Sequence, residues 1–233
     1  MGVPSRHDFW LDRLNLPAYR VGEAASYVGS SPQQIAYWEK TGEQGQALSK
    51  RAERAGVSYL QLIEISVVSS MRKAGVKLQA IRDARKYFSK RLGLEFPFAQ
   101  AKFKTDGAEI LTEIEGSNGE ALKDKLLSAS ANGQLVWSDV LQGRFEQFDY
   151  SENGLVVRFH PRKNLERVVI DPSVSLGAPS VEGVPTWVIR ERWLAGETLA
   201  DIVDDFVISF DSVVEALKFE DLEVDYDRPG FAA

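Results

Sequence analysis

Cysteine is absent from this chain of 233 residues, and histidine occurs only twice, as His7 and His160. Without cysteine there are no disulfides, no thiolate zinc sites and no cysteine nucleophiles. Two isolated histidines also exclude a histidine-rich metal centre. No apolar run reaches the roughly 18 residues that a membrane-spanning helix needs, and the first residues lack the apolar core of a signal peptide. We therefore expect a cytoplasmic protein without a membrane segment, metal or cofactor.

Catalytic motifs are missing as well. The sequence contains no Gly-rich phosphate loop, no Gly-x-Ser-x-Gly turn and no zinc motif. Paired carboxylates occur at Asp204-Asp205, Glu220-Asp221 and Asp225/Asp227, but each pair lies in an acidic run without the apolar surroundings that would tune a catalytic pKa. We interpret these pairs as solvated surface and do not expect an enzyme.

The net charge of −6 combines two halves of opposite sign. Residues 1–104 contain 17 Lys and Arg against 9 Asp and Glu, a net +8. Residues 105–233 contain 11 Lys and Arg against 25 Asp and Glu, a net −14. This asymmetry predicts a basic surface suited to a polyanion and an acidic surface that would repel one.

Periodicity and turn residues predict an α+β fold, mainly α, in four parts. These are a helical DNA-binding domain over 1–104, a β-containing connector over 105–165, a three-helix domain over 166–219 and an acidic tail over 220–233. The first part begins with two short helices, at 21–28 and 32–40, which are separated by Gly29. Ser30 or Ser31 is the expected N-cap of the second helix, with Pro32 at its first position. Two short helices joined in this way are typical of a helix-turn-helix, and the polar, basic residues 41–56 suit an exposed wing.

The later elements follow from the same signals. Ser58 and Gln61 form the expected capping box of a helix that ends near 74, and Gly93 is expected to end another over 77–92. Thr198 and Asp201 mark the start of a second helix in the C-terminal part, and Ser209 or Asp211 that of a third. The remaining expected elements are strands at 107–115, 143–147, 155–160 and 167–170, and helices at 120–130 and 187–194.

The second short helix carries side chains suited to reading DNA. Gln33 and Gln34 can each bond to both polar atoms of an adenine edge in the major groove, while basic and hydroxyl side chains hold phosphates. The alternative is an amphipathic helical pair with a solvated polar face. The complete set of expected DNA contacts is Arg20, Ser31, Gln33, Gln34, Tyr37, Lys40, Lys50, Arg51 and Arg54.

Residues 19–85 resemble the winged helix-turn-helix of the MerR family. The resemblance rests on YRVGEAASYVGSSPQQIAYWE from Tyr19, on Ser58–Leu62 and on MRKAGVKLQAIR from Met71. It implies that Gln33, Gln34 and Tyr37 face the major groove and that 41–56 form the wing. Unlike MerR regulators, which dimerise through a long C-terminal helix, this chain has no heptad run after Gly93. The cysteines of metal-sensing members are absent too.

The C-terminal part is similar to a small domain of unknown function that begins with an Ile-Asp-Pro strand and a Gly-x-Pro turn, here 170–172 and 177–179. The usual Gly-Thr-Arg of that domain is Gly183-Val184-Pro185 in this chain. The arrangement of a MerR-like domain followed by this C-terminal domain resembles one group of VapB-type antitoxins. The resemblance implies a partner toxin with a PIN-like ribonuclease fold and repression of the pair's own promoter. Because operator half-sites mirror protein symmetry, we expect a homodimer or a toxin-bridged assembly.

The acidic C-terminal helices are expected to bind protein, because carboxylates oppose the counterion release that drives DNA binding. In the tail, Leu222, Val224 and Tyr226 alternate with acidic residues, so an extended tail would present an apolar row for strand addition to the toxin. Arg228 would then pair with the carboxylates of a nuclease site. The alternative is a frayed terminus that is disordered when unbound. Two further hypotheses are a MerR-like regulator without a toxin, and an adaptor that binds proteins and no DNA.

Overall fold

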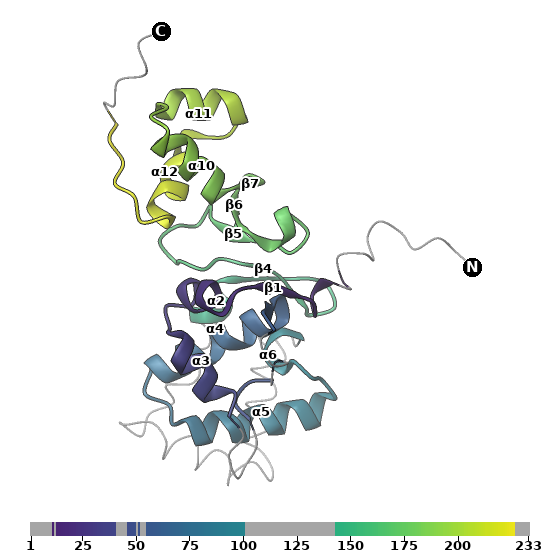
Figure 1. The fold of residues 1–233 in the computed structure, drawn as a ribbon. Helices are drawn as coiled ribbons and strands as arrows, with labels where there is room; N and C mark the ends of the chain where they lie inside the picture. The colour runs from purple at the N-terminus through teal and green to yellow at the C-terminus, as the bar shows by residue number, and fades with distance from the viewer. Residues whose placement is uncertain are drawn as a thin grey trace, which may run out of the picture. The chain divides into compact units, whose positions relative to one another are not determined.

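The computed structural model describes residues 11, 13–40, 46–49, 51, 55–100 and 143–226. Helices and strands are mixed, as expected for an α+β protein (Figure 1). The chain divides into two compact units, Met1–Val157 and Arg158–Ala233. The strand expected at 107–115 and the helix expected at 120–130 lie outside the described residues.

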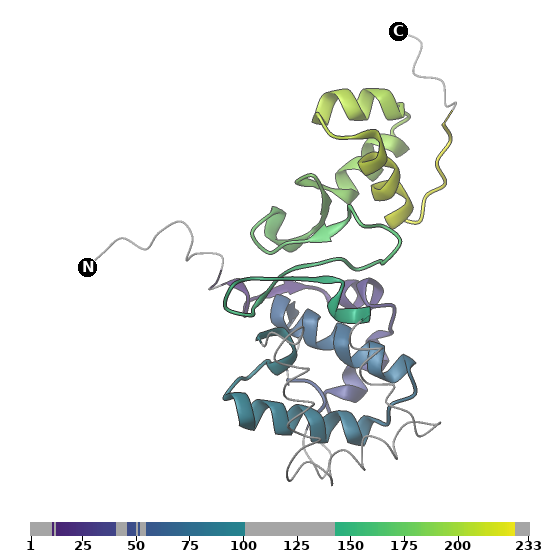
Figure 2. The same ribbon diagram turned by 180° about the vertical axis from the view of Figure 1, so that it is seen from behind.

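Up to Gln100, the described residues of unit 1 form a two-stranded antiparallel sheet and five helices. Figure 2 shows its two long helices, α4 and α5, from behind. The elements are β1 (Pro17–Tyr19), α2 (Val21–Tyr27), α3 (Pro32–Trp38), β2 (Val57–Ser58), α4 (Tyr59–Lys73), α5 (Leu78–Leu92) and α6 (Pro97–Gln100).

Local capping signals set the starts of α3 and α4, as predicted. The Ser31 hydroxyl accepts a hydrogen bond from the Gln34 backbone N–H at 3.2 Å, and Gln34 Oε1 accepts one from the Ser31 N–H at 2.9 Å. Ser58 and Gln61 form the same reciprocal pair at the start of α4. Gly93 ends α5 in the left-handed conformation, with φ 67°. These bonds satisfy donors and acceptors that a helix end leaves open.

A buried charge lies in the middle of α4. Glu64 is 1% exposed, and its carboxylate accepts hydrogen bonds from Arg85 Nε at 2.9 Å and from the Phe98 backbone N–H at 2.8 Å. Burial raises the pKa of this carboxyl, and the Arg85 charge opposes that rise. The Arg85 guanidinium also donates to Ser49 Oγ at 2.6 Å and to the Glu95 carbonyl at 2.7 Å. One ion pair therefore joins α4, α5, the segment before α6 and the chain at 46–49.

The strand that we predicted at 143–147 is wrong, because the structure has a helical turn over 143–145 and the strand β3 begins at Phe148. Phe145 and Phe148 are both 4% exposed. Their three-residue spacing matches a helical turn, which places both rings on one side. The predicted hairpin turn at 151–154 is present, with β3 (Phe148–Tyr150) before it and β4 (Val156–Phe159) after it.

Unit 2 combines short antiparallel strands with three helices. Beyond β4, the strands β5, β6 and β7 pair in sequence order, and β6 packs against the last helix. Its elements are β5 (Val169–Ile170), the 3-10 turn η1 (Ser175–Gly177), β6 (Pro179–Val181), β7 (Val184–Pro185), α10 (Thr186–Leu194), α11 (Leu199–Phe206) and α12 (Phe210–Phe219). Thr198 and Ser209 are the N-caps of α11 and α12. Ser209, and not Asp211, is therefore the N-cap of the last helix.

The hairpin turn between β6 and β7 is tied to the start of α12. Glu182 and Gly183 both have positive φ, 47° and 87°, as a tight two-residue hairpin turn requires. The Glu182 carboxylate accepts hydrogen bonds from the Ser209 N–H at 3.1 Å and from the Ser209 and Ser212 hydroxyls at 2.6 Å. These bonds to the ionised form lower the Glu182 pKa to about 2.

We expect Glu182→Gln to destabilise unit 2 at neutral pH. A carboxylate whose pKa is lowered in the folded state stabilises the fold fully above its ordinary pKa, near 4.5, and loses this effect as the pH falls towards about 2. The stability difference between the two proteins should therefore be largest at pH 7 and shrink as the pH falls between these values. Urea unfolding across this pH range measures it.

Glu191→Gln is the matched control, since it removes the same charge from an exposed side chain that pairs with Arg190 on the surface of α10. Its stability should stay close to wild type at every pH. An E182Q curve parallel to that of wild type would contradict the assigned role of Glu182.

Candidate DNA-binding helix and protein-binding tail

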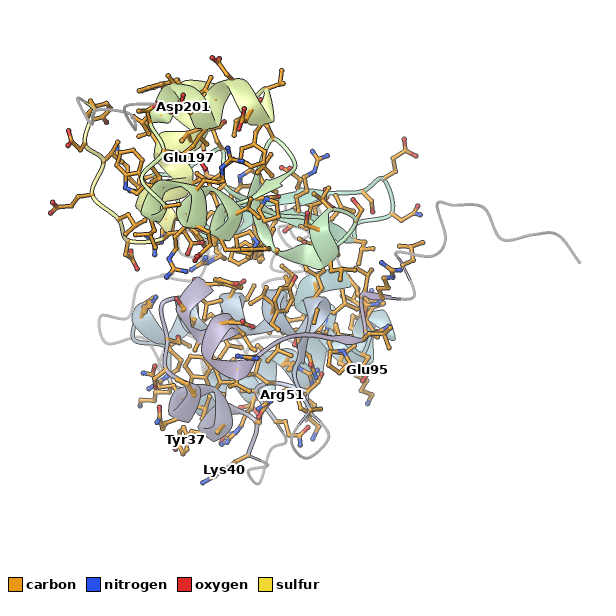
Figure 3. The ribbon with its side chains drawn as sticks, turned by 45° about the horizontal axis from the view of Figure 1, so that its top comes forward. Tyr37, Lys40, Arg51, Glu95, Glu197 and Asp201 are labelled. Carbon is orange, nitrogen blue, oxygen red and sulfur yellow. The ribbon has the colours of Figure 1, made fainter. Side chains whose placement is uncertain are left out.

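The outer face of α3 is polar and exposed. Ile35 and Trp38 are 0% and 3% exposed and hold the helix on the core, so Gln33 and Tyr37 lie on the solvent side. The Tyr37 side chain is 57% exposed. Figure 3 shows Tyr37 and Lys40 at the outer edge of unit 1. A helix that enters a DNA groove requires such a face of long polar side chains.

Ser31 and Gln34, two of the predicted DNA contacts, bond to each other in the capping box at the start of α3. The Gln34 side-chain oxygen is thereby occupied, and only its amide N–H groups remain to donate. Bidentate adenine recognition uses both the oxygen and the nitrogen of a glutamine amide. Gln33, which is exposed on the same helix, suits that role better than Gln34.

Arg51, a predicted phosphate contact, is turned inward. Its Nε and Nη2 atoms lie 2.5 and 2.9 Å from the two Glu39 carboxylate oxygens, and Nη1 donates to the Ala55 carbonyl at 2.8 Å. The Arg51 and Glu39 side chains are 13% and 14% exposed. This bidentate pair attaches the segment after α3 to the residue that ends the helix. Sequence reasoning missed it, because the two residues are twelve positions apart and share no local pattern.

Of the other predicted phosphate contacts, two are exposed and two lie outside the described residues. Arg20 is exposed at the start of α2, where its backbone N–H donates to Glu23 Oε2 at 2.7 Å. Lys40 is exposed, and its carbonyl accepts a hydrogen bond from Arg82 at 2.9 Å, which ties α5 to the end of α3. Lys50 and Arg54 lie outside the described residues.

The turn between α2 and α3 is held in place by α4. The Val28 carbonyl accepts hydrogen bonds from Ser69 Oγ at 3.1 Å and from Lys73 Nζ at 3.0 Å. Gly29 follows with φ 60°, and a Cβ there would lie 2.8 Å from Lys73 Nζ. Partial burial and the nearby Arg144 charge lower the pKa of Lys73. The left-handed backbone, rather than the available space, therefore favours glycine at this turn, because the close atom is the mobile end of a lysine side chain. The bonds from α4 to the Val28 carbonyl hold the turn before α3.

The predicted apolar row of the tail is partly covered by unit 2 itself. Leu222 and Val224 are half-buried and alternate with the exposed Glu223 and Asp225. Figures 1 and 2 both show the tail running beside the three helices. Tyr226 is 61% exposed, and its ring stacks on Phe210 with centroids 6.2 Å apart and planes at 29°.

The expected disorder of the unbound tail therefore does not describe residues 220–226, because half-buried apolar side chains and a ring stack give them defined positions. Arg228 lies outside the described residues.

Arginines of unit 2 are held by carboxylates of the same unit. Arg192 pairs with Glu197 and Asp205. Two further arginines act in the same way: Arg167 lies 3.2 Å from Asp211, and Arg162 lies 3.0 Å from Asp221 and over the Phe219 ring. Arg162 and Arg167 connect the loop between β4 and β5 to α12 and the residue after it, and Arg192 connects α10 to α11. Positive charge is thus used internally, while many carboxylates remain at the surface.

Within the described residues no helix has both the length and the apolar character to cross a membrane. No group of three or more acidic or histidine side chains in the same part of the chain is arranged to hold a metal ion.

Comparison with known proteins finds similarity to a named protein and to a solved structure, and no family model matches the chain. A protein of Mycobacterium tuberculosis named "Putative antitoxin VapB45" is 26% identical over 226 residues, covering 88% of this chain and 94% of the relative. The crystal structure of Rv2018 from Mycobacterium tuberculosis has a TM-score of 0.70 at 24% identity, covering 88% of this chain and 99% of that one. The second likeness shows a shared fold, and the first shows distant homology with a protein named as an antitoxin.

Arg51→Ala tests whether this side chain anchors the wing segment or contacts a ligand. Since it removes three hydrogen bonds, two of them to a half-buried carboxylate, we expect the free energy of unfolding to fall by about 1–3 kcal/mol. Urea unfolding measures this value. Glu39→Gln and the double variant complete a mutant cycle, in which the two losses should not add. Unchanged stability would show that the guanidinium is not an anchor.

Proposed function

We propose that this protein is the antitoxin of a type II toxin–antitoxin pair. The observation that carries the proposal is the near full-length alignment with a protein named as a VapB antitoxin, which spans both units of this chain. An antitoxin of this kind neutralises a ribonuclease toxin and represses its own operon. The excess of positive charge in residues 1–104 and the net negative charge of unit 2 suit these two tasks.

In this proposal unit 1 is a MerR-like winged helix-turn-helix that holds operator DNA. The support is the exposed polar face of α3, the hydrogen bonds from α4 to the Val28 carbonyl before Gly29, and the bonds from Arg85 to Ser49 and from Arg51 to Glu39. Gln33 and Tyr37 enter the major groove, and Arg20, Lys40, Lys50 and Arg54 contact phosphates. Arg51 acts through Glu39 to hold the wing. Two protomers bind a symmetric operator, so the free protein is a dimer or becomes one through the toxin.

Unit 2 binds the toxin, for which a PIN-like ribonuclease fold is proposed from the resemblance stated above. Its carboxylate-rich helices oppose nucleic acid and suit a protein that itself binds RNA and is therefore basic. Leu222, Val224 and Tyr226 supply apolar contacts, with Arg228 directed to the nuclease carboxylates.

The second candidate is a MerR-like transcription regulator without a toxin, which the polar face of α3 also supports. The two differ in whether unit 2 has a toxic protein as its partner.

Co-expression with the product of the neighbouring gene tests the toxin half. We expect the neighbour alone to arrest growth, the pair to restore it, and the two proteins to purify as one complex. Light scattering of the protein alone and of the complex then gives the oligomeric state. Indifferent growth and no co-purification would favour the regulator without a toxin.

Gln33→Ala tests the DNA half. The affinity for the operator should fall by about 1–3 kcal/mol, with lost discrimination confined to particular base pairs. Binding isotherms on operator variants, measured at several salt concentrations, detect this pattern. Gln34→Ala is the matched control: because it removes a helix cap, it should weaken binding to all sequences alike. A uniform loss for Gln33→Ala would mean that α3 does not read bases.

A further inference from the structure

The turn between α11 and α12 carries an unusual residue. Val207 has φ 54° and ψ 45°, and its backbone N–H bonds to the Val203 carbonyl at the end of α11. A left-handed residue at a helix end is usually glycine, because a β-branched side chain is strained there. The Val207 side chain is also 87% exposed, the largest value among the exposed hydrophobic residues of the described chain. Glycine would suit the backbone better, and nothing within the described chain covers this side chain.

Two aromatic rings, Phe210 and Tyr226, lie close to this turn. We call the turn at Val207 together with these two rings the α11–α12 corner. Phe210 is the first residue of α12, is 45% exposed, and stacks on Tyr226 of the tail. The tail thus returns from the far end of α12 to a point beside the strained turn. Exposed apolar side chains grouped in this way mark a surface that binds another protein, and aromatic rings are common anchors at such interfaces.

The rim of this corner is acidic. Residues 197–226 contain ten Asp and Glu but a single Lys. Asp204, Asp211 and Asp225, which flank the three apolar residues along the chain, are all exposed. Arg192 and Arg167 neutralise part of this charge through Asp205 and Asp211. An apolar knob with a carboxylate rim complements an apolar pocket with a basic rim.

We propose that Val207, Phe210 and Tyr226 form the anchor by which unit 2 docks into an apolar, basic-rimmed pocket on the ribonuclease partner. The inference rests on the proposed antitoxin function and locates the contact at the α11–α12 corner, in addition to the tail. An enzyme that binds RNA carries cations around its RNA groove, so the carboxylate rim would occupy the place of phosphates. The strained valine keeps an apolar side chain at the tip of the corner, where glycine would leave none.

Leu176 provides a matched comparison within the same unit. It also combines a positive φ, 58°, with high exposure, 70%. The chain around it, from Ser173 to Val181, contains no charged residue, and no aromatic ring is stacked beside it. Strain and exposure are therefore shared by the two sites, whereas the aromatic pair and the acidic rim belong to the corner.

The test uses full-length wild type, Val207→Gly and Leu176→Gly with the purified product of the neighbouring gene. Both glycine variants relieve a left-handed backbone, so their unfolding midpoints should equal or exceed that of wild type. We expect V207G to weaken the dissociation constant at least tenfold and to lose inhibition of the nuclease in proportion. L176G should bind like wild type. Tyr226→Ala, which leaves α12 intact, should also weaken binding, and Asp204→Asn should slow association and reduce its salt dependence.

The possible results distinguish a failure of the docking corner from a failure of the antitoxin function. Wild-type affinity in V207G and Y226A, or an equal loss in L176G, would overturn the corner while leaving the antitoxin function intact. A change in the protein's own oligomeric state in V207G, with partner binding unaffected, would assign the corner to a second copy of this chain and also overturn the proposal. If wild type neither binds nor neutralises the neighbour, the antitoxin function fails, and the docking corner fails with it.

Discussion

The arrangement of unit 1 depends on satisfying one buried carboxylate. Glu64 lies in the most buried helix, where an unpaired charge would cost several kcal/mol. Arg85 and the Phe98 N–H supply its hydrogen bonds, which brings α5 and α6 against α4. The remaining donors of Arg85 then hold Ser49 and the Glu95 carbonyl. Because α4 also holds the Val28 carbonyl through Ser69 and Lys73, the position of α3 follows from the same helix.

Charged side chains have different tasks in the two units. In unit 1, Arg85 pairs with the buried Glu64 and Arg51 pairs with Glu39, and exposed cations such as Arg20 and Lys40 remain. In unit 2, Arg162, Arg167 and Arg192 pair with carboxylates of the same unit, and the surplus at the surface is negative. Unit 2 contains 15 Asp and Glu against 8 Lys and Arg, a net −7, whereas the excess of positive charge in unit 1 lies within residues 1–104.

Local signals made much of the fold predictable. Ser31, Ser58 and Thr198 begin helices as expected, because a cap and its partner lie three residues apart in the sequence. The exposed face of α3 follows from helical periodicity alone. Contacts between distant residues were not predictable, since they require the fold itself. The pairs Arg51–Glu39 and Glu64–Arg85 and the bonds from Glu182 to Ser209 join elements that only tertiary packing brings together.

The two units also differ in which residue types have a positive φ. Across the described part of unit 1, every residue with a positive φ is a glycine, whereas unit 2 has Glu182, Asp221 and Val207 among its exceptions. Glu182 accepts hydrogen bonds from Ser209 and Ser212 at the start of α12, and Asp221 pairs with Arg162, so in these two cases the side chain makes contacts that glycine could not make. Val207 has no such internal contact within the described chain. Leu176 is strained and exposed in the same way, so the positive φ does not by itself distinguish the turn after α11. The ring pair of Phe210 and Tyr226 and the exposed carboxylates near Val207 are the features that support the protein contact proposed for this turn.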